Sequence, residues 1–233
     1  MSNLANATQE AVRLLWTKDP ALIEIIVLSL QVSGLGLLLS TIVGIPLGSW
    51  MGLTDFPGRR FVMALLYTGM GFPPVVVGLL VYLLLSRSGP LGFLGWLFTP
   101  PAMVVAQTII SFPLVAGFTM AAVMSVDPNL RQQVLSLGAT RRQATLTILS
   151  EARVGVVVSV IAGFGSIISE VGAVILVGGN IEGRTRVLTT AIVLETRKGN
   201  FEPAMALGIV LLGLTFMANV MMLRLQGGRI RAA

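Results

Sequence analysis

The 233-residue sequence has no cysteine and no histidine. Their absence excludes disulfide bonds, thiol catalysis, zinc sites built on these side chains and imidazole acid–base chemistry. Charged residues are also scarce, at 11% of the chain against about 25% in soluble domains. The sequence has no Gly-x-x-x-x-Gly-Lys-Ser/Thr stretch either, which excludes ATP binding by a phosphate-binding loop of that kind.

Apolar residues make up 55% of the chain, and they lie in long continuous runs without alternation. This pattern predicts an all-α polytopic membrane protein in a lipid bilayer and argues against a β-barrel. In a soluble protein, the net charge of +6 would suggest a nucleic-acid partner. Here the basic residues cluster at helix ends, so orientation in the bilayer and anionic lipid explain them, and no nucleic-acid partner is expected.

The apolar runs predict a single membrane domain over residues 20–226 with about five transmembrane helices. We expect an amphipathic segment before it, at residues 1–19, and a cytoplasmic tail after it, at residues 227–233. The expected spans are residues 21–53, 61–85, 101–126, 154–177 and 203–225.

The basic residues also predict the orientation of the chain. If residues 127–153 are cytoplasmic, five spans bring the Arg59-Arg60 loop and the C-terminal tail to the same side. That side then holds nine basic residues against three acidic ones, and the other side holds seven against six. The positive-inside rule therefore predicts an external N-terminus and a cytoplasmic C-terminus in the cell's inner membrane.

The most informative stretch is the polar segment at residues 127–153, hereafter the coupling segment. It opens with an aspartate followed by a proline, which is typical of a helix start. Gly138 interrupts the helical pattern, and Thr140 with Gln143 three residues later is a capping box that restarts it. The segment is therefore predicted to be helix, glycine bend, helix.

A compact basic segment of this kind has little use on a membrane protein unless another protein holds it. Leu130, Val134 and Leu137 recur at helical spacing and would form an apolar face. We therefore expect the coupling segment to be a docking site for a partner protein.

The second and third spans contain prolines at membrane depth. Pro73 and Pro74 remove two successive backbone donors, so the second span must break or kink, and Pro113 is a weaker case in the third. Irregular backbone inside a membrane is tolerated where it is buried in protein or lines a cavity. The break therefore marks either a transport pathway or a fixed kink, and the sequence leaves both open.

The first span carries small residues at every fourth position, which places them along one helix face. They are Gly36, Ser40, Gly44, Gly48 and Gly52. A stripe of this kind lets another helix approach closely, so we expect it to be a packing face, with a direct pathway role as the alternative.

Glu170 falls inside the predicted fourth span. A carboxylate at mid-bilayer costs on the order of 3 kcal/mol, so it should face protein or water. We expect a structural or gating residue that is hydrogen-bonded to a neighbouring helix or paired with an arginine. A direct substrate or proton role is the alternative.

The connection at residues 178–201 is a glycine-rich turn followed by a short amphipathic helix, which should end near Gly199. We interpret it as an external gate or a receptor-docking surface, with a solvated connector as the alternative. Its candidate residues are Asn180, Gly183, Arg184 and Arg186.

Residues 132–140, with Ile148 ten residues after Gly138, resemble the "EAA" coupling loop of ABC importer permeases. The usual Glu-Ala-Ala is Gln132-Gln133-Val134 here, and Ser150-Glu151 replaces the usual Leu-Pro. Residues 162–173 and 177–188 look like the molybdate/tungstate branch of that family, and residues 189–199 are most similar to tungstate permeases.

This resemblance implies the transmembrane domain of a type I ABC importer, which works as a homodimer. Two ABC ATPase subunits would bind ATP-Mg and dock on the coupling segments, and an extracytoplasmic tungstate-binding protein would deliver the oxyanion. The chain itself would bind no cofactor or metal and would not be an enzyme. The implied ATPase-coupling residues are Leu130, Gln133, Val134, Leu137, Gly138, Ala139, Thr140 and Arg141.

A pathway for a tetrahedral dianion should offer hydroxyls, amides and helix N-termini. The candidate translocation and gate residues are Pro73, Pro74, Thr108, Ser111, Ser166, Ser169 and Glu170.

Three other interpretations remain at this point. The cargo could be molybdate, sulfate or phosphate. The chain could be a secondary transporter or channel that works without ATP and uses Glu170 as a proton-linked switch. It could also be a non-transporting subunit of a membrane complex.

Overall fold

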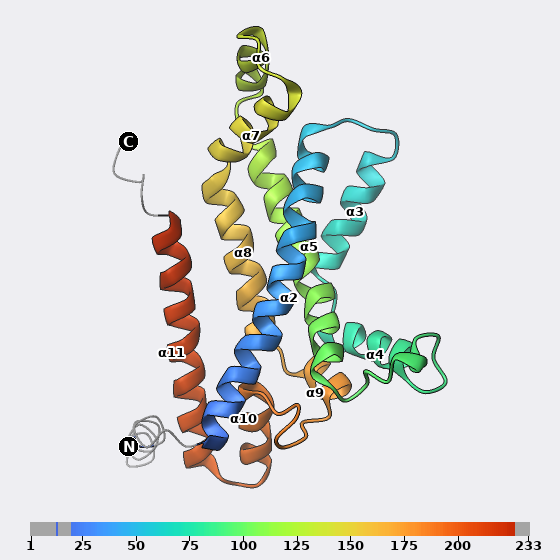
Figure 1. Ribbon diagram of the computed structural model, residues 1–233, viewed down its shortest axis with the longest axis vertical. Coiled ribbons are helices and arrows are strands. Elements are labelled where there is room, and N and C mark those ends of the chain that lie inside the picture. Colours follow the sequence, from blue (N-terminus) through green and yellow to red (C-terminus); the bar gives the residue numbers. More distant parts are fainter. Residues whose placement is uncertain (1–12, 14–19, 227–233) are drawn as a thin grey trace.

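The computed structural model describes residue 13 and residues 20–226, so the predicted segment at 1–19 and tail at 227–233 lie outside the described residues, apart from Arg13. The described part forms ten α-helices and one 3₁₀ turn, without strands. Long helices stand side by side in Figure 1, and shorter helices cover the two ends of the bundle. The predicted all-α class is therefore confirmed.

Three helices are long and apolar enough to cross a membrane: α2 (Pro20–Leu53), α5 (Pro100–Met124) and α11 (Phe201–Gln226). Two bent pairs are long enough only when each pair is taken together. They are α3 (Arg59–Met70) with α4 (Pro74–Leu85), and α7 (Arg141–Glu151) with α8 (Arg153–Ile168). By length and composition, residues 20–226 thus contain three to five spans, in line with the predicted five.

The expected second span is divided into α3 and α4, which meet at an angle of 99°. Pro73 is extended, with ψ 120°, because the ring of Pro74 disfavours helical backbone in the residue before it. By contrast, α5 continues through Pro113, where the expected weaker break does not occur. A single proline removes one hydrogen bond, and the Pro113 ring packs against Gly69 of α3.

The expected fourth span also differs, because α8 ends at Ile168 rather than near Val177. A separate short helix, α9 (Gly172–Gly178), follows a break that contains Glu170. Ser169 and Glu170 in this break are flanked on both sides by long apolar runs, so the average hydropathy of the region did not reveal it.

The small-residue stripe packs as predicted. Its residues lie against α5, and a Cβ on Gly36 would sit 3.0 Å from the Cβ of Gln107. Ser40 donates to the carbonyl oxygen of Thr108 and shares a hydrogen bond with Ser111. The helices α2 and α5 therefore pack closely against each other along this stripe.

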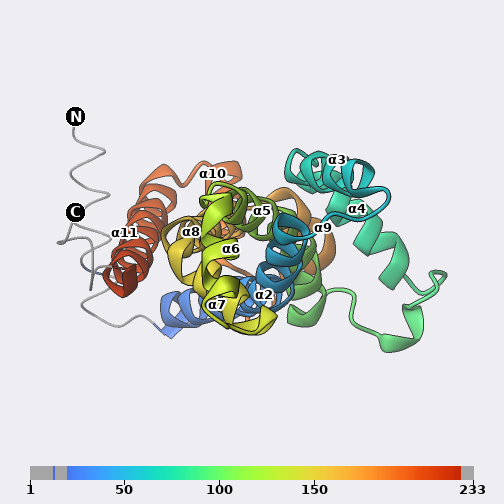
Figure 2. The same ribbon diagram turned by 90° about the horizontal axis from the view of Figure 1, so that it is seen from above.

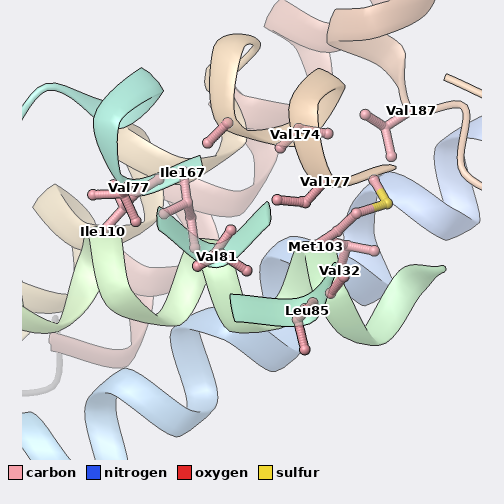
Figure 3. Packing of buried hydrophobic residues seen from close by; sticks show 13 residues of the cluster. Val32, Val77, Val81, Leu85, Met103, Ile110, Ile167, Val174, Val177 and Val187 are labelled. Carbon is pink, nitrogen blue, oxygen red and sulfur yellow. The ribbon is translucent and has the colours of Figure 1, made fainter. Parts of the chain in front are cut away.

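The main apolar core fastens the two short helices to the bundle. In Figure 3, Val77, Val81 and Leu85 of α4 and Val174 and Val177 of α9 lie close to α5. Gly78 allows the close approach of α4 and α9, since a Cβ there would sit 2.6 Å from the Cα of Ala173. The helices that follow the two breaks, α4 and α9, therefore pack together in one apolar core.

The remaining helices complete the ends of the bundle. The coupling segment begins with α6 (Pro128–Ser136) and lies with α7 at one end, beside the connection between α2 and α3 (Figure 1). The 3₁₀ turn η1 (Gly92–Leu94), α9 and α10 (Leu188–Arg197) lie toward the opposite end. Seen from above, α11 and the α3–α4 pair flank the bundle on opposite sides (Figure 2).

Candidate functional site

The coupling segment folds as the sequence predicts. Asp127 caps α6 by accepting a hydrogen bond from the backbone N–H of Asn129 at 2.8 Å, and Pro128 occupies the first turn. Thr140 caps α7 in a complete capping box with Gln143. Both helix starts are therefore fixed by local sequence.

Gly138 forms the bend between these helices with a left-handed φ of +88°. The N–H of Gly138 donates to the Leu135 carbonyl oxygen, and the N–H of Ala139 donates to that of Val134. This is a Schellman ending, which favours glycine at the left-handed position. The bend thus has one defined shape rather than being a loose connection.

The exposed side chains of the coupling segment differ in part from the expected face. Leu137 is 87% exposed at the tip, whereas Leu130 and Val134 are half-buried against the protein itself. Gln133, Gly138, Thr140 and Arg141 are exposed, and Ala139 is half-buried. The most accessible apolar group for a partner is therefore Leu137 rather than a stripe of three residues.

Two further residues secure this segment to the bundle. Ile148 of α7 is buried in a cluster with Val123 and Ala152. Arg131 of α6 donates from Nη1 to the carbonyl oxygen of Leu53, at the end of α2. The sequence gives no indication of the second contact, because its partners are 78 residues apart and one of them is a backbone atom.

A cavity of about 440 Å³ lies at the break between α3 and α4 and is called the hinge cavity below. Pro73, Pro74 and Ser166 line it, together with apolar residues of α3, α4 and α5. Its lining residues Phe72 and Ile109 are 46% and 40% exposed, so the cavity opens to the outside of the chain. The structure thus brings three of the seven predicted pathway residues together.

The other pathway candidates lie elsewhere. Ser111 is fully buried and donates to the Gln107 carbonyl oxygen, in the contact between α2 and α5. Thr108 donates to the Val104 carbonyl oxygen, and Ser169 to that of Gly165. These hydroxyls are engaged in helix packing and backbone hydrogen bonds.

Glu170 lies in the break between α8 and α9. Its Oε1 accepts a hydrogen bond from the N–H of Ala173 at 3.0 Å, and its carbonyl oxygen accepts one from Thr189 at 3.0 Å. No arginine pairs with this carboxylate within the described chain. The residue therefore caps a short helix and joins it to the residues of α10.

The connection from α9 to α11 is held to the rest of the protein by buried hydrogen bonds. The buried hydroxyl of Thr185 donates to the Gly178 carbonyl oxygen and accepts from the N–H of Ile181. The N–H of Leu188, at the start of α10, donates to Ser29 of α2 at 2.9 Å. Sequence reasoning missed Thr185 and Ser29, which make the connection an ordered element rather than a solvated link.

The predicted residues of this connection lie near its surface. Asn180 adopts a positive φ of 52°, and Gly183 is exposed with φ +67°. Arg186 pairs with Glu182 at 3.1 Å, and Arg184 is exposed. The four predicted residues therefore lie close together in the chain, within residues 180–186.

The end of α10 carries a local charge cluster. Glu195 accepts hydrogen bonds from Asn200 at 2.8 Å and from Lys198 at 2.9 Å. The Asn200 amide, followed by the Lys198 ammonium, lowers the pKa of Glu195 below its usual value of 4.5. Gly199 ends the helix with φ +80°, as the sequence predicts.

Comparison with known proteins places this geometry in a family. The chain is 45% identical over 205 residues to a probable anion ABC transporter permease protein of Haloferax volcanii, covering 86% of this chain and 88% of that one. It is 39% identical to the tungstate uptake system permease protein TupB of Peptoclostridium acidaminophilum, covering 97% and 99%.

A solved bacterial alginate ABC transporter, in complex with an alginate-bound periplasmic protein, has the same fold. Its matching chain aligns with a TM-score of 0.68 at 27% identity, over 88% of this chain and 79% of that one. Residues 44–231 match the family described as "binding-protein-dependent transport system inner membrane component". The chain therefore belongs to this family of ABC importer permeases, and its molybdate/tungstate branch is the one that the sequence resembles.

Proposed function

We propose that this chain is the permease of an ATP-driven oxyanion importer whose cargo is tungstate. The observation that carries the proposal is the 39% identity to a tungstate uptake permease over nearly the whole of both chains. The family match is consistent with a transport subunit, so ATP-Mg would be bound and hydrolysed by a separate subunit.

Each of two permease copies would dock one ATPase subunit on its coupling segment. The exposed Leu137 at the tip and the fixed bend at Gly138 support this role, because a rigid projecting element can transmit force. Closure of the ATPase pair on ATP would then push α6 and α7 and tilt the helices joined to them.

The hinge cavity supports assembly as a homodimer. It opens to the outside of a single chain, and a second copy packed over α3 and α4 would enclose it. The oxyanion would pass between the copies, with the kinked backbone at Pro73 and Pro74 in the wall of the pathway.

A binding protein would deliver tungstate at the opposite end, where α9 and α10 lie (Figure 1). The solved relative in complex with a periplasmic protein supports a partner of this kind. With the coupling segment cytoplasmic, the N-terminus is external and the C-terminus is internal, as the basic residues favour.

The test is uptake into proteoliposomes that contain the complex purified from its native membrane. Tungstate should enter only with ATP on the ATPase side and binding protein on the other, and excess sulfate should compete poorly. Preferential uptake of molybdate or sulfate would reassign the cargo. Uptake by the chain alone, abolished by a proton uncoupler, would overturn the proposal in favour of a secondary transporter.

A further inference from the structure

We propose that Arg131 is a positioning residue that transmits movement of the coupling segment directly to the carboxyl end of α2. This inference rests on the proposed function, since it assigns a route for the force that an ATPase would apply. The inference is based on the side chains that donate hydrogen bonds to the last carbonyl oxygens of α2.

The last carbonyl groups of a helix lack partners within it and carry a partial negative charge. α2 has no basic residue in its own last turn. Instead, Arg59 of α3 donates from Nε to the Met51 carbonyl oxygen at 3.1 Å, and Arg131 of α6 donates to that of Leu53 at 3.1 Å. Two guanidinium groups from other helices therefore cap this helix end.

The two arginines are not equivalent. Arg59 follows α2 by a short connection, pairs with Asp55 at 3.2 Å and also donates from Nη2 to the sulfur of Met124 in α5 at 3.6 Å, so none of these contacts reaches the coupling segment. Arg131 belongs to the coupling segment, 78 residues farther along the chain. Of the two arginines, Arg131 is therefore the one that links α6 to α2, alongside the packing of Leu53 against the cluster of Ile148.

The attachment of α6 to the rest of the protein is otherwise slight. α6 has no fully buried residue, and the other hydrogen bonds of its described side chains are local. A cavity of about 440 Å³ separates much of α6 from the end of α2, with Arg131 and Arg59 in its wall. The Arg131–Leu53 hydrogen bond therefore spans a gap that apolar packing does not fill.

The receiving helix can carry the movement across the membrane. α2 is one helix of 34 residues, and its small-residue stripe holds it against α5. In its N-terminal third, Ser29 accepts a hydrogen bond from the N–H of Leu188 at the start of α10. A pull at Leu53 would thus reach the connection at residues 178–201 without passing through the bend between α7 and α8.

The experiment compares Arg131→Met with Arg59→Met in the complete transporter, with the exposed Arg60→Met as control. Each complex is purified with its ATPase and assayed for tungstate transported per ATP hydrolysed. Hydrogen exchange at residues 49–55 and 128–136 is followed with and without ATP. A charged donor forms a strong hydrogen bond, so Arg131→Met should lower the transport ratio about tenfold, and Arg131→Lys should partly restore it.

The hydrogen-exchange data distinguish a residue that transmits movement from α6 to α2 from one that only caps the end of α2. In Arg131→Met, ATP should still change exchange at residues 128–136 but no longer at residues 49–55. Arg59→Met should lower thermal stability while keeping both ATP responses and the transport ratio. Wild-type values for Arg131→Met, or equal losses in both variants, would overturn the inference. A wild-type chain that retains no ATPase or does not transport tungstate would instead contradict the proposed function.

Discussion

Gly48 of α2 lies directly against the carbonyl oxygen of Ala116 in α5, so closely that a Cβ at Gly48 would collide with it. Because the obstacle is backbone, no side-chain rotation can relieve the contact. Gly34, on the same helix, has nothing within 4 Å of its Cβ position. A comparison of substitutions at Gly48 and Gly34 therefore distinguishes the effect of close packing from the effect of helix propensity.

We expect Gly48→Ala to destabilise the protein by about 1–3 kcal/mol through overpacking of the α2–α5 contact. Gly34→Ala should be neutral or stabilising by up to about 1 kcal/mol, since alanine favours helix. The stability of both variants is measured by heating the protein in detergent and using size-exclusion chromatography to determine the fraction that stays folded. Equal melting temperatures for the two variants would show that the stripe is not a tight contact.

Gly138 tests the bend of the coupling segment. Proline fixes φ near −65°, far from the +88° of the native bend, whereas asparagine enters the left-handed region readily. Gly138→Pro should therefore abolish ATPase co-purification and tungstate uptake, while the amount of the protein in the membrane stays unchanged. Gly138→Asn should keep most of the co-purification and most of the uptake. Normal uptake by the proline variant would refute the coupling assignment.

Glu170 tests the helix cap at the start of α9. The amide oxygen of Glu170→Gln can still accept the Ala173 N–H, so transport should stay within about twofold of the wild-type rate. Glu170→Leu removes the acceptor and should cost about 1 kcal/mol of stability. Neither variant should change which anion is preferred in competition assays. Complete loss of transport in the glutamine variant alone would point to a proton-linked role.

Glu195 gives a prediction about pH. Its folded pKa is lowered, so the stabilisation is present above the ordinary value of 4.5 and is lost as pH falls through the lower folded value. A ¹³C NMR titration of the carboxyl group, assigned with Glu195→Gln, should show a midpoint below 4.5. Asn200→Ala should raise that midpoint more than Lys198→Met, because the Asn200 hydrogen bond is the larger cause. A wild-type midpoint at or above 4.5 would contradict the described contacts.

Local patterns in the sequence were sufficient wherever a few neighbouring residues fix the backbone. The aspartate–proline start of α6, the left-handed Gly138 and the capping box of Thr140 are all present as predicted. The break at Pro73-Pro74 was also predictable, since two prolines remove hydrogen bonds whatever surrounds them. These features make the coupling segment recognisable, although the residues that contact an ATPase stay a prediction.

Contacts between segments that are distant in the chain could not be predicted from the sequence. Nothing near Arg131 indicates that it reaches Leu53, and nothing near Ser111 shows that it bonds to Ser40 rather than lining a pathway. The break before α9 was missed because Ser169 and Glu170 lie between two long apolar runs that together suggest one continuous span.

Hydropathy and backbone chemistry act over short stretches of chain, so the amino-acid sequence was enough to predict a helical membrane protein with a bent polar segment at residues 127–153. The folded structure was needed to show which hydroxyls are used in packing, that Leu137 is the exposed leucine at the bend, and that Arg131 joins α6 to α2. The physical reason is that burial and hydrogen bonding depend on neighbours in space, and a helix end accepts a donor from whichever segment the fold brings beside it.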